Sequence, residues 1–189
     1  MGRTDAGFAS VRRAVVLDPL NPRSHYVLGR VLYFARRYDE AIAAWSAALS
    51  VEPKYKPAHG FRGLTYYALG NLESARSSCE FDPEYWLGQW CLAVTYDKLG
   101  RRADAEAALT KLKAVNGDAS AYQYATIYAQ WGGTAKALEW LEKAMRLRDS
   151  GLEWLKTDPL LDPLRTEPRF QAIERELRFP NGIRSMALQ

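Results

Sequence analysis

Residues 22–55, PRSHYVLGRVLYFARRYDEAIAAWSAALSVEPKY, decide the fold of this chain. Apolar residues recur in this stretch at helical spacing, and the polar pair Arg36-Arg37 interrupts the pattern halfway. Gly29 and Ala41 stand twelve residues apart on either side of that interruption. Where two antiparallel helices cross, small residues let the backbones approach closely. The stretch therefore predicts a hairpin of two helices.

The same pairing of small residues recurs three more times, each time with an offset of twelve residues. The further pairs are Gly63 with Ala75, Ala93 with Ala105, and Ala125 with Ala137. Turn signals lie between the two halves of each unit, at Gly70-Asn71, Gly100-Arg101 and Gly132-Gly133. The repeats predict four hairpins, over residues 22–55, 56–83, 86–117 and 118–149. Because each repeat buries its apolar face only against its neighbours, we expect an all-α solenoid of antiparallel helix hairpins.

The first hairpin resembles the tetratricopeptide repeat, a unit of 34 residues. The resemblance rests on Leu28-Gly29, Leu32, Tyr38-Asp39-Glu40-Ala41, Trp45, Ala48-Leu49 and Pro53. It implies a superhelix that binds other proteins. From Gly63 to Ala93 the period falls to 30 residues, because Asp82-Pro83 comes about one helical turn early. We therefore expect the second helix of that repeat to be truncated.

The segments on either side of the four hairpins follow other patterns. Residues 1–20 predict the second helix of an incomplete repeat, residues 150–180 a C-terminal cap ending in a helix, and residues 181–189 a loose tail. The chain thus begins in mid-repeat, which favours a piece of a longer protein over a helix capped by another subunit. The cap contains Trp154-Leu155-Lys156-Thr157-Asp158-Pro159 and resembles the ends of repeat arrays in bacterial multidomain signalling proteins. Class III adenylate cyclases and winged-helix regulators are examples, so the resemblance implies a regulatory C-terminal arm.

Composition excludes several classes of protein. Of the 189 residues, 48% are hydrophobic and 25% charged, which permits a sizeable core and makes intrinsic disorder improbable. No apolar run approaches the roughly 20 residues that span a bilayer, and no secretory signal is visible. Two cysteines, Cys79 and Cys91, are too few for a disulfide framework. We expect a cytoplasmic protein with two unpaired thiols and no membrane partner.

Catalytic signatures are missing from the sequence. It contains no P-loop, no dinucleotide-binding glycine pattern, no His-Glu-x-x-His and no Gly-x-Ser-x-Gly. His25 and His59 stand one repeat apart, and a shared metal ion would need both rings to converge with further ligands. We expect both imidazoles to pack within the repeats instead. The sequence predicts no enzyme, no cofactor and no metal.

The resemblance to tetratricopeptide repeats places a concave groove along the first helices of the hairpins. Aromatic and arginine side chains, which dominate binding hot spots, are frequent at the groove offsets. A basic end near Arg23 and Arg30 favours an acidic, partly apolar peptide. The groove residues implied are Arg23, Tyr26, Arg30, Tyr33, Phe34, Leu64, Tyr67, Trp90, Asp97, Lys98, Tyr122, Thr126 and Gln130.

Two alternatives to a peptide receptor stay open. In one, the array is an assembly device that self-associates through the incomplete N-terminal hairpin, where Asp in place of Val11 or Val15 would give monomers. In the other, which is less favoured, it binds nucleic acid. A net charge of +4 and the cations Arg23, Arg30, Arg36 and Arg37 suggest this, but basic and acidic residues are interspersed.

Overall fold

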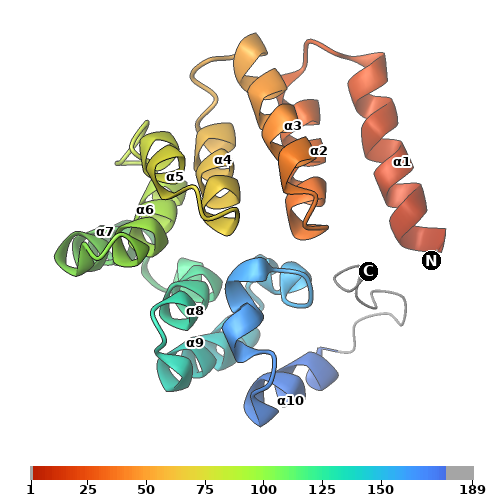
Figure 1. Cartoon of the computed structure of the whole chain (residues 1–189). Coiled ribbons are helices and arrows are strands. Elements are labelled where there is room, and N and C mark those ends of the chain that lie inside the picture. The colour runs from red at the N-terminus through yellow and green to blue at the C-terminus, as the bar shows by residue number, and fades with distance from the viewer. Residues whose placement is uncertain (1, 178–189) are drawn as a thin grey trace.

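The computed structural model describes the backbone of residues 2–177 and the side chains of residues 7–177. Over that range the chain is all-helical, with no strand (Figure 1). The α-helices are α1 (Gly2–Leu17), α2 (Pro22–Phe34), α3 (Tyr38–Val51), α4 (Lys56–Ala68), α5 (Leu72–Cys79), α6 (Trp86–Lys98), α7 (Arg102–Asn116), α8 (Ala121–Gln130), α9 (Thr134–Leu147) and α10 (Pro168–Glu176). Three 3-10 helices complete the set: η1 (Gly117–Ser120), η2 (Ser150–Trp154) and η3 (Pro159–Leu164). The solenoid of helix hairpins expected from the sequence is confirmed.

Local sequence sets where several helices begin. Asn21 precedes α2, and its side chain accepts a hydrogen bond from the backbone N–H of Arg23. Asn71 does the same for Ser74 at the start of α5. Each side chain satisfies one of the donors that the first helical turn leaves free. Pro168 occupies the first turn of α10, where its missing N–H costs nothing, as the sequence predicts.

The turn inside each hairpin places one residue in the left-handed backbone region. Gly70, Gly100 and Gly132 have φ angles of 76°, 77° and 74° there. The first hairpin has Arg36 at the equivalent position, with φ of 60°. Side chains with a Cβ disfavour this region, whereas glycine enters it freely. The first turn therefore carries backbone strain that the other three avoid.

The small residues at helix crossings are needed for the packing seen. A Cβ on Gly29 would lie 2.7 Å from the buried ring of Trp45. A Cβ on Gly63 would lie 2.6 Å from the sulfur atoms of both Cys79 and Cys91. Both distances are far inside van der Waals contact, so the crossings of α2 with α3 and of α4 with α5 depend on glycine.

The two cysteines correct the sequence prediction of unpaired thiols. Cys79 ends α5 and Cys91 lies on α6, and the structure joins them in a disulfide with 5.6 Å between the Cα atoms. Gly63 leaves room for both sulfur atoms where α4, α5 and α6 meet. Counting cysteines did not reveal the pair because the contact forms between consecutive repeats.

Helix α5 is short, as the early Asp82-Pro83 predicts. It has eight residues, against 14 in α3 and 15 in α7. Helix α4 contacts α6 directly beside it. The second repeat therefore has less helix on its outer layer than the repeats on either side.

The array curves until its last part meets its first full repeat (Figure 1). We call residues 150–165, which contain η2 and η3, the C-terminal segment. It lies beside α8 and reaches α2, where Trp154 stacks on Phe34 with 4.0 Å between ring centroids. Leu160 belongs to the same buried cluster as Phe34 and Leu64. The cap thus closes the concave side of the array.

Candidate functional site

The predicted groove residues divide into three groups by exposure. Arg23 and Lys98 are exposed. Five are partly buried: Tyr26, Arg30, Tyr67, Asp97 and Gln130. Six are buried: Tyr33, Phe34, Leu64, Trp90, Tyr122 and Thr126. The buried six cannot contact a ligand while the chain keeps this conformation.

Two of the buried six hold neighbouring repeats together. Trp90 on α6 donates from its indole nitrogen to the hydroxyl of Thr126 on α8, at 2.8 Å. Trp45 on α3 donates in the same way to Thr65 on α4, at 3.1 Å. Each bond satisfies the one polar atom of a large apolar side chain, so these tryptophans belong to the core.

The C-terminal segment covers the α8 side of the predicted groove. The hydroxyl of Tyr122 donates to the carboxylate of Asp158 at 2.8 Å. The amide nitrogen of Gln130 donates to the backbone oxygen of Leu160 at 2.7 Å. The amide oxygen of Gln130 accepts from the hydroxyl of Tyr67 on α4, also at 2.7 Å. These groove residues bind the chain's own backbone and side chains.

At α2 and in the turn after it, the same segment makes the contacts that we call the closed seam. The guanidinium of Arg36 donates two hydrogen bonds to the carboxylate of Asp162, at 2.6 and 2.7 Å. Arg30 lies over the ring of Trp154, 5.1 Å from its centroid, and its charge lies 3.6 Å from the carboxylate of Glu153. Of the two residues at the basic end predicted for the groove, Arg30 thus already faces an acidic side chain, whereas Arg23 is exposed.

Asp158 is the buried carboxyl of the C-terminal segment. Its side chain is fully buried and accepts hydrogen bonds from the backbone N–H of Leu160 and from Tyr122. Burial raises the pKa of Asp158 to about 6, against the opposing effects of these hydrogen bonds and of Arg165. This carboxyl therefore changes its charge near pH 6.

A second part of the surface is aromatic and remains uncovered. We call Tyr26, Tyr55, Tyr85 and Trp86 the open edge, since all four are partly exposed. They lie at the N-terminal ends of α2, α4 and α6. The rings of Tyr26 and Tyr55 are 5.7 Å apart, as are those of Tyr85 and Trp86. Burial raises the pKa of Tyr26 and of Tyr55, so both stay protonated and can donate a hydrogen bond at neutral pH.

Basic side chains flank the open edge. Lys56 lies 5.8 Å from the ring centroid of Tyr85 and pairs with Asp82 at 2.6 Å. Arg23 is exposed, and its charge opposes the effect of burial, which raises the pKa of Tyr55. Sequence reasoning found Tyr26 and Arg23 but missed Tyr55, Tyr85 and Trp86. A signal was present, since Tyr55 and Tyr85 each stand directly before a first helix.

Asp97 and Lys98 lie at the C-terminal end of α6, and Trp86 of the open edge lies at its N-terminal end. The carboxylate of Asp97 accepts a hydrogen bond from Arg102 on α7 at 2.7 Å. The guanidinium of Arg102 lies 3.9 Å from the ring centroid of Trp131. This cluster joins consecutive repeats.

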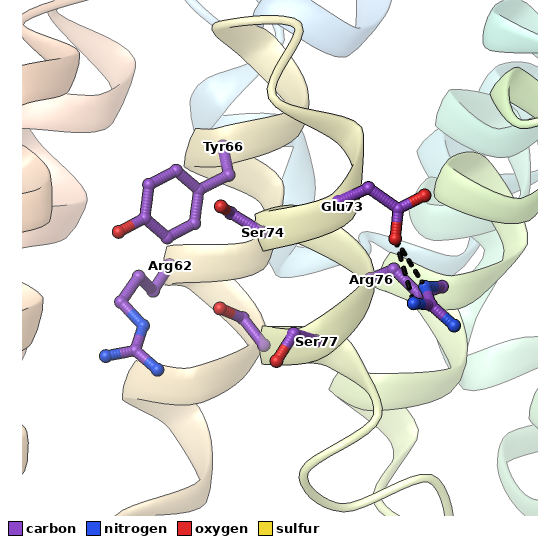
Figure 2. Close-up of a pocket in the computed structure, with 7 residues that line it drawn as sticks. Arg62, Tyr66, Glu73, Ser74, Arg76 and Ser77 are labelled. Atoms are coloured by element: carbon purple, nitrogen blue, oxygen red, sulfur yellow. Dashed lines mark hydrogen bonds and ion pairs between the residues drawn. The ribbon is translucent and has the colours of Figure 1, made fainter.

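A polar hollow of about 480 Å³ lies between α4 and α5 (Figure 2). Arg62 and Tyr66 reach into it from α4, and three serines line it from α5: Ser74, Ser77 and Ser78. Glu73 pairs with Arg76 at its margin, at 2.8 Å. The hollow is shallow and lacks the aromatic surface of the open edge.

The two histidines occupy equivalent places in consecutive repeats. The ring nitrogen Nε2 of His25 lies 2.8 Å from the backbone oxygen of Pro19, and that of His59 lies 2.8 Å from the oxygen of Pro53. His59 also stacks on Phe81, and its burial lowers its pKa. Within the described residues, no three His, Cys, Asp or Glu side chains gather where they could hold a metal ion.

Two further structural facts concern the classes of partner. Among residues 2–177, none of the helices combines the length and the apolar character needed to cross a membrane. Three of the four arginines that suggested nucleic-acid binding face carboxylates: Arg30 faces Glu153, Arg36 faces Asp162 and Arg37 faces Glu40. Their charge is therefore largely compensated within the chain.

Comparison with known proteins confirms the repeats. Residues 26–80 and residues 119–150 each match a tetratricopeptide repeat model. No curated protein matches the chain.

Solved structures with the same fold include a thermophilic tetratricopeptide repeat protein of Thermus thermophilus. It is 24% identical, with a TM-score of 0.64 over 81% of this chain and 87% of the other. PilF of Pseudomonas aeruginosa is 16% identical, with a TM-score of 0.55 over 93% and 90% of the two chains. YrrB, described as a repeat protein with an unusual peptide-binding site, is 14% identical, with a TM-score of 0.51 over 87% and 97%. Together with the family models, these likenesses identify residues 26–80 and 119–150 as tetratricopeptide repeats in an α-solenoid.

Proposed function

We propose that this chain is a non-catalytic protein-interaction module that binds a peptide segment of a partner at the open edge. The observation that carries the proposal is a run of partly exposed aromatic rings across three consecutive first helices. Tyr26 contacts Phe61, Phe61 contacts Trp90 and Trp90 contacts Trp86, with ring centroids 5.9 to 6.4 Å apart. The buried members hold the exposed ones in place, so little side-chain entropy is lost on binding.

The chemistry of the edge favours an acidic, partly apolar peptide. The tyrosine rings offer apolar area and hydroxyl donors, and the exposed Arg23 adds positive charge beside them. Lys56 is already paired with Asp82. YrrB, with the same fold, is described as having a peptide-binding site, which supports the class of ligand.

A peptide array tests this function. The probes are synthetic 15-residue peptides that contain one aromatic residue and either four acidic or four basic residues. We expect the acidic set to bind, and Tyr55→Ala to weaken binding at least fivefold. Tyr96→Ala is the matched control, because Tyr96 is also partly exposed but contacts Glu80 on another part of the surface. Equal losses in both variants, or binding of the basic set alone, would contradict the proposal.

We further propose that the chain serves as the regulatory C-terminal arm of a bacterial signalling protein such as an adenylate cyclase. The support is the resemblance of Trp154-Leu155-Lys156-Thr157-Asp158-Pro159 to the ends of such arrays. An immunoblot that reads the size of the native product tests it. A band much larger than 21.4 kDa is expected, and a band at that size would end the proposal.

A cytoplasmic location belongs to the same proposal, and the disulfide between Cys79 and Cys91 bears against it. Disulfides are rare in the reducing cytosol of most organisms. Both cysteines are buried in the folded chain, so cells are quenched in acid and the protein is alkylated in denaturant. Two modified thiols support the cytoplasm, and none supports an oxidising compartment.

Self-association is the second candidate, and α1 provides the observation that favours it. Val16, Leu17 and Leu20, on α1 and just after it, are exposed to 79%, 72% and 77%. Val11 and Val15, the residues expected from the sequence, are instead partly buried. Light scattering should therefore report a dimer that Leu17→Asp dissociates, and an unchanged mass would remove this candidate.

A further inference from the structure

The C-terminal segment lies where a partner peptide would be expected in the predicted groove. It is continuous in sequence, SGLEWLKTDPLLDPLR over residues 150–165, and contacts both α2 and α8. Trp154 stacks on Phe34, while Leu160 is buried with its backbone oxygen bonded to Gln130. The segment thus shows which chemistry the concave face accepts.

The segment presents one aromatic and two acidic side chains at intervals of four residues. Trp154 meets Phe34 and Arg30, Asp158 meets Tyr122, and Asp162 meets Arg36. Each acidic group faces a hydrogen-bond donor of the array. Trp154 stacks against an aromatic ring and a guanidinium, and Asp162 forms a two-bond ion pair with Arg36. Both contacts depend on geometry, so they are specific.

The position of Arg36 indicates that this recognition is maintained at a cost. Arg36 adopts the left-handed backbone conformation for which the other three hairpins use Gly70, Gly100 and Gly132. Strained backbone persists where surrounding interactions require it. Here the interaction is the pair of hydrogen bonds to Asp162, which a glycine could not make.

Some buried hydrogen-bond donors at the closed seam nevertheless have no partner. The hydroxyl of Tyr33, the Nε of Arg30 and the indole nitrogen of Trp154 are buried without a hydrogen-bond partner in the described part of the chain. Buried polar atoms are normally paired, and leaving them unpaired weakens the closed arrangement. The segment contains two short 3-10 helices, which have little stability of their own. It is held in place by tertiary contacts, chiefly those of its buried leucines, Leu152, Leu155, Leu160, Leu161 and Leu164.

We propose that residues 150–165 are a built-in competitor. A partner segment displaces residues 150–165 from α2 and α8 when it has an aromatic residue and, four and eight residues after it, acidic residues. This inference rests on the proposed function as a peptide-binding module, and it adds the partner's pattern and an autoinhibited state.

Binding in trans tests the proposal on the full chain. The probe is a fluorescent synthetic peptide of residues 150–165, titrated by anisotropy. We expect Trp154→Ala/Asp162→Asn, which weakens the internal segment and leaves α2 intact, to bind the probe at least tenfold more tightly than the unmodified chain. Arg36→Gly relieves the strained turn but removes the forked pair, so it should not gain this affinity. A probe peptide that itself carries Trp154→Ala and Asp162→Asn should bind neither the unmodified chain nor the double variant.

Equal affinity for the double variant and the unmodified chain, or no binding by a double variant with native circular dichroism, would overturn the proposal. If the double variant does not fold, hydrogen exchange of the unmodified chain decides. Amides of residues 152–165 should exchange at least tenfold faster than those of α8. If the amides of residues 152–165 and of α8 exchanged at one common rate, the segment would not open independently, and the proposal would be refuted.

The peptide array keeps the two proposals apart. If acidic peptides bind the open edge but the probe never binds the double variant, the competitor inference alone fails. If neither the acidic peptides nor the probe binds, both the proposed function and the competitor inference fail.

Discussion

The two ends of helix α2 carry similar side chains in different surroundings. At its N-terminal end, Arg23 and Tyr26 belong to or flank the open edge and remain accessible. At its C-terminal end, Phe34 is buried under the C-terminal segment, and Arg36 in the following turn is paired with Asp162. Aromatic and basic composition therefore does not reveal which part of a first helix is available. The difference comes from a segment more than 100 residues away in sequence.

The largest expected difference between the two surfaces is in stability. Phe34 is 6% exposed, so Phe34→Ala should lower the free energy of unfolding by about 3–5 kcal/mol through lost burial and a residual cavity. Tyr55→Ala at the open edge should cost less than about 1 kcal/mol. Urea unfolding followed by circular dichroism measures both. Similar losses would mean that the open edge is part of the core.

The disulfide provides the second test, because it fixes α6, which carries Trp86 of the open edge, to α5. Reduction should lower the free energy of unfolding by about 2–3 kcal/mol, the size expected for a short loop. Hydrogen exchange should then accelerate in residues 72–80 more than in the C-terminal segment. Alkylation of the unreduced protein in denaturant is the control, because both cysteines are buried in the folded chain. Two modified thiols in that sample would refute the disulfide.

The third test concerns the buried carboxyl of the C-terminal segment and varies the pH. The pKa of Asp158 is about 6 in the folded chain and near 4 in an unfolded one. A raised carboxyl pKa favours folding most below the unfolded value, and this contribution is lost as the pH rises through 6. Asp158 should therefore make the chain more stable at pH 5 than at pH 8, by roughly 1 kcal/mol.

Asp158→Asn separates this carboxyl from the other titrating groups. The amide retains an oxygen for the Leu160 N–H and does not ionise, so the difference between pH 5 and pH 8 should shrink in thermal unfolding. The open edge has no buried carboxyl in its aromatic row, and Tyr55→Ala should leave the pH dependence unchanged. A full pH dependence in Asp158→Asn would assign it to another group.

The hairpins could be predicted from sequence because they depend on local periodicity. The spacing from Gly29 to Ala41 reports a helix crossing within one repeat, and the same holds for Gly63 and Ala75. The early Asp82-Pro83 likewise predicts the short α5. Each of these features involves residues fewer than 20 positions apart.

The exposure of the candidate site could not be predicted in the same way. Arg36 and Asp162 are 126 positions apart, and no repeat register relates them. Whether they meet depends on the curvature summed over four hairpins and on where the cap leaves α9. The position of Arg36 held a hint, since the equivalent residues of the other turns are glycines. That hint indicates a constraint on the side chain but does not identify the partner.

Arg30 lies between the two surfaces, and its replacement should have the smallest effect. Its guanidinium is 5.8 Å from the ring centroid of Tyr26 at the open edge and 5.1 Å from that of Trp154 at the closed seam. Arg30→Lys keeps the charge but loses the planar stacking, which is worth about 0.5–1 kcal/mol at partly exposed sites. Unfolding should change by no more than this amount.

Binding should respond to Arg30→Lys at both surfaces if the residue couples them. The acidic array peptides at the open edge and the 150–165 probe at the seam should each weaken roughly two- to fivefold, the equivalent of that stacking energy. Lys98→Arg, at the opposite end of α6 from Trp86, is a matched control that retains one positive charge. A loss confined to one peptide would assign Arg30 to that surface alone, and the two halves of the concave face would then act as separate sites on one helix.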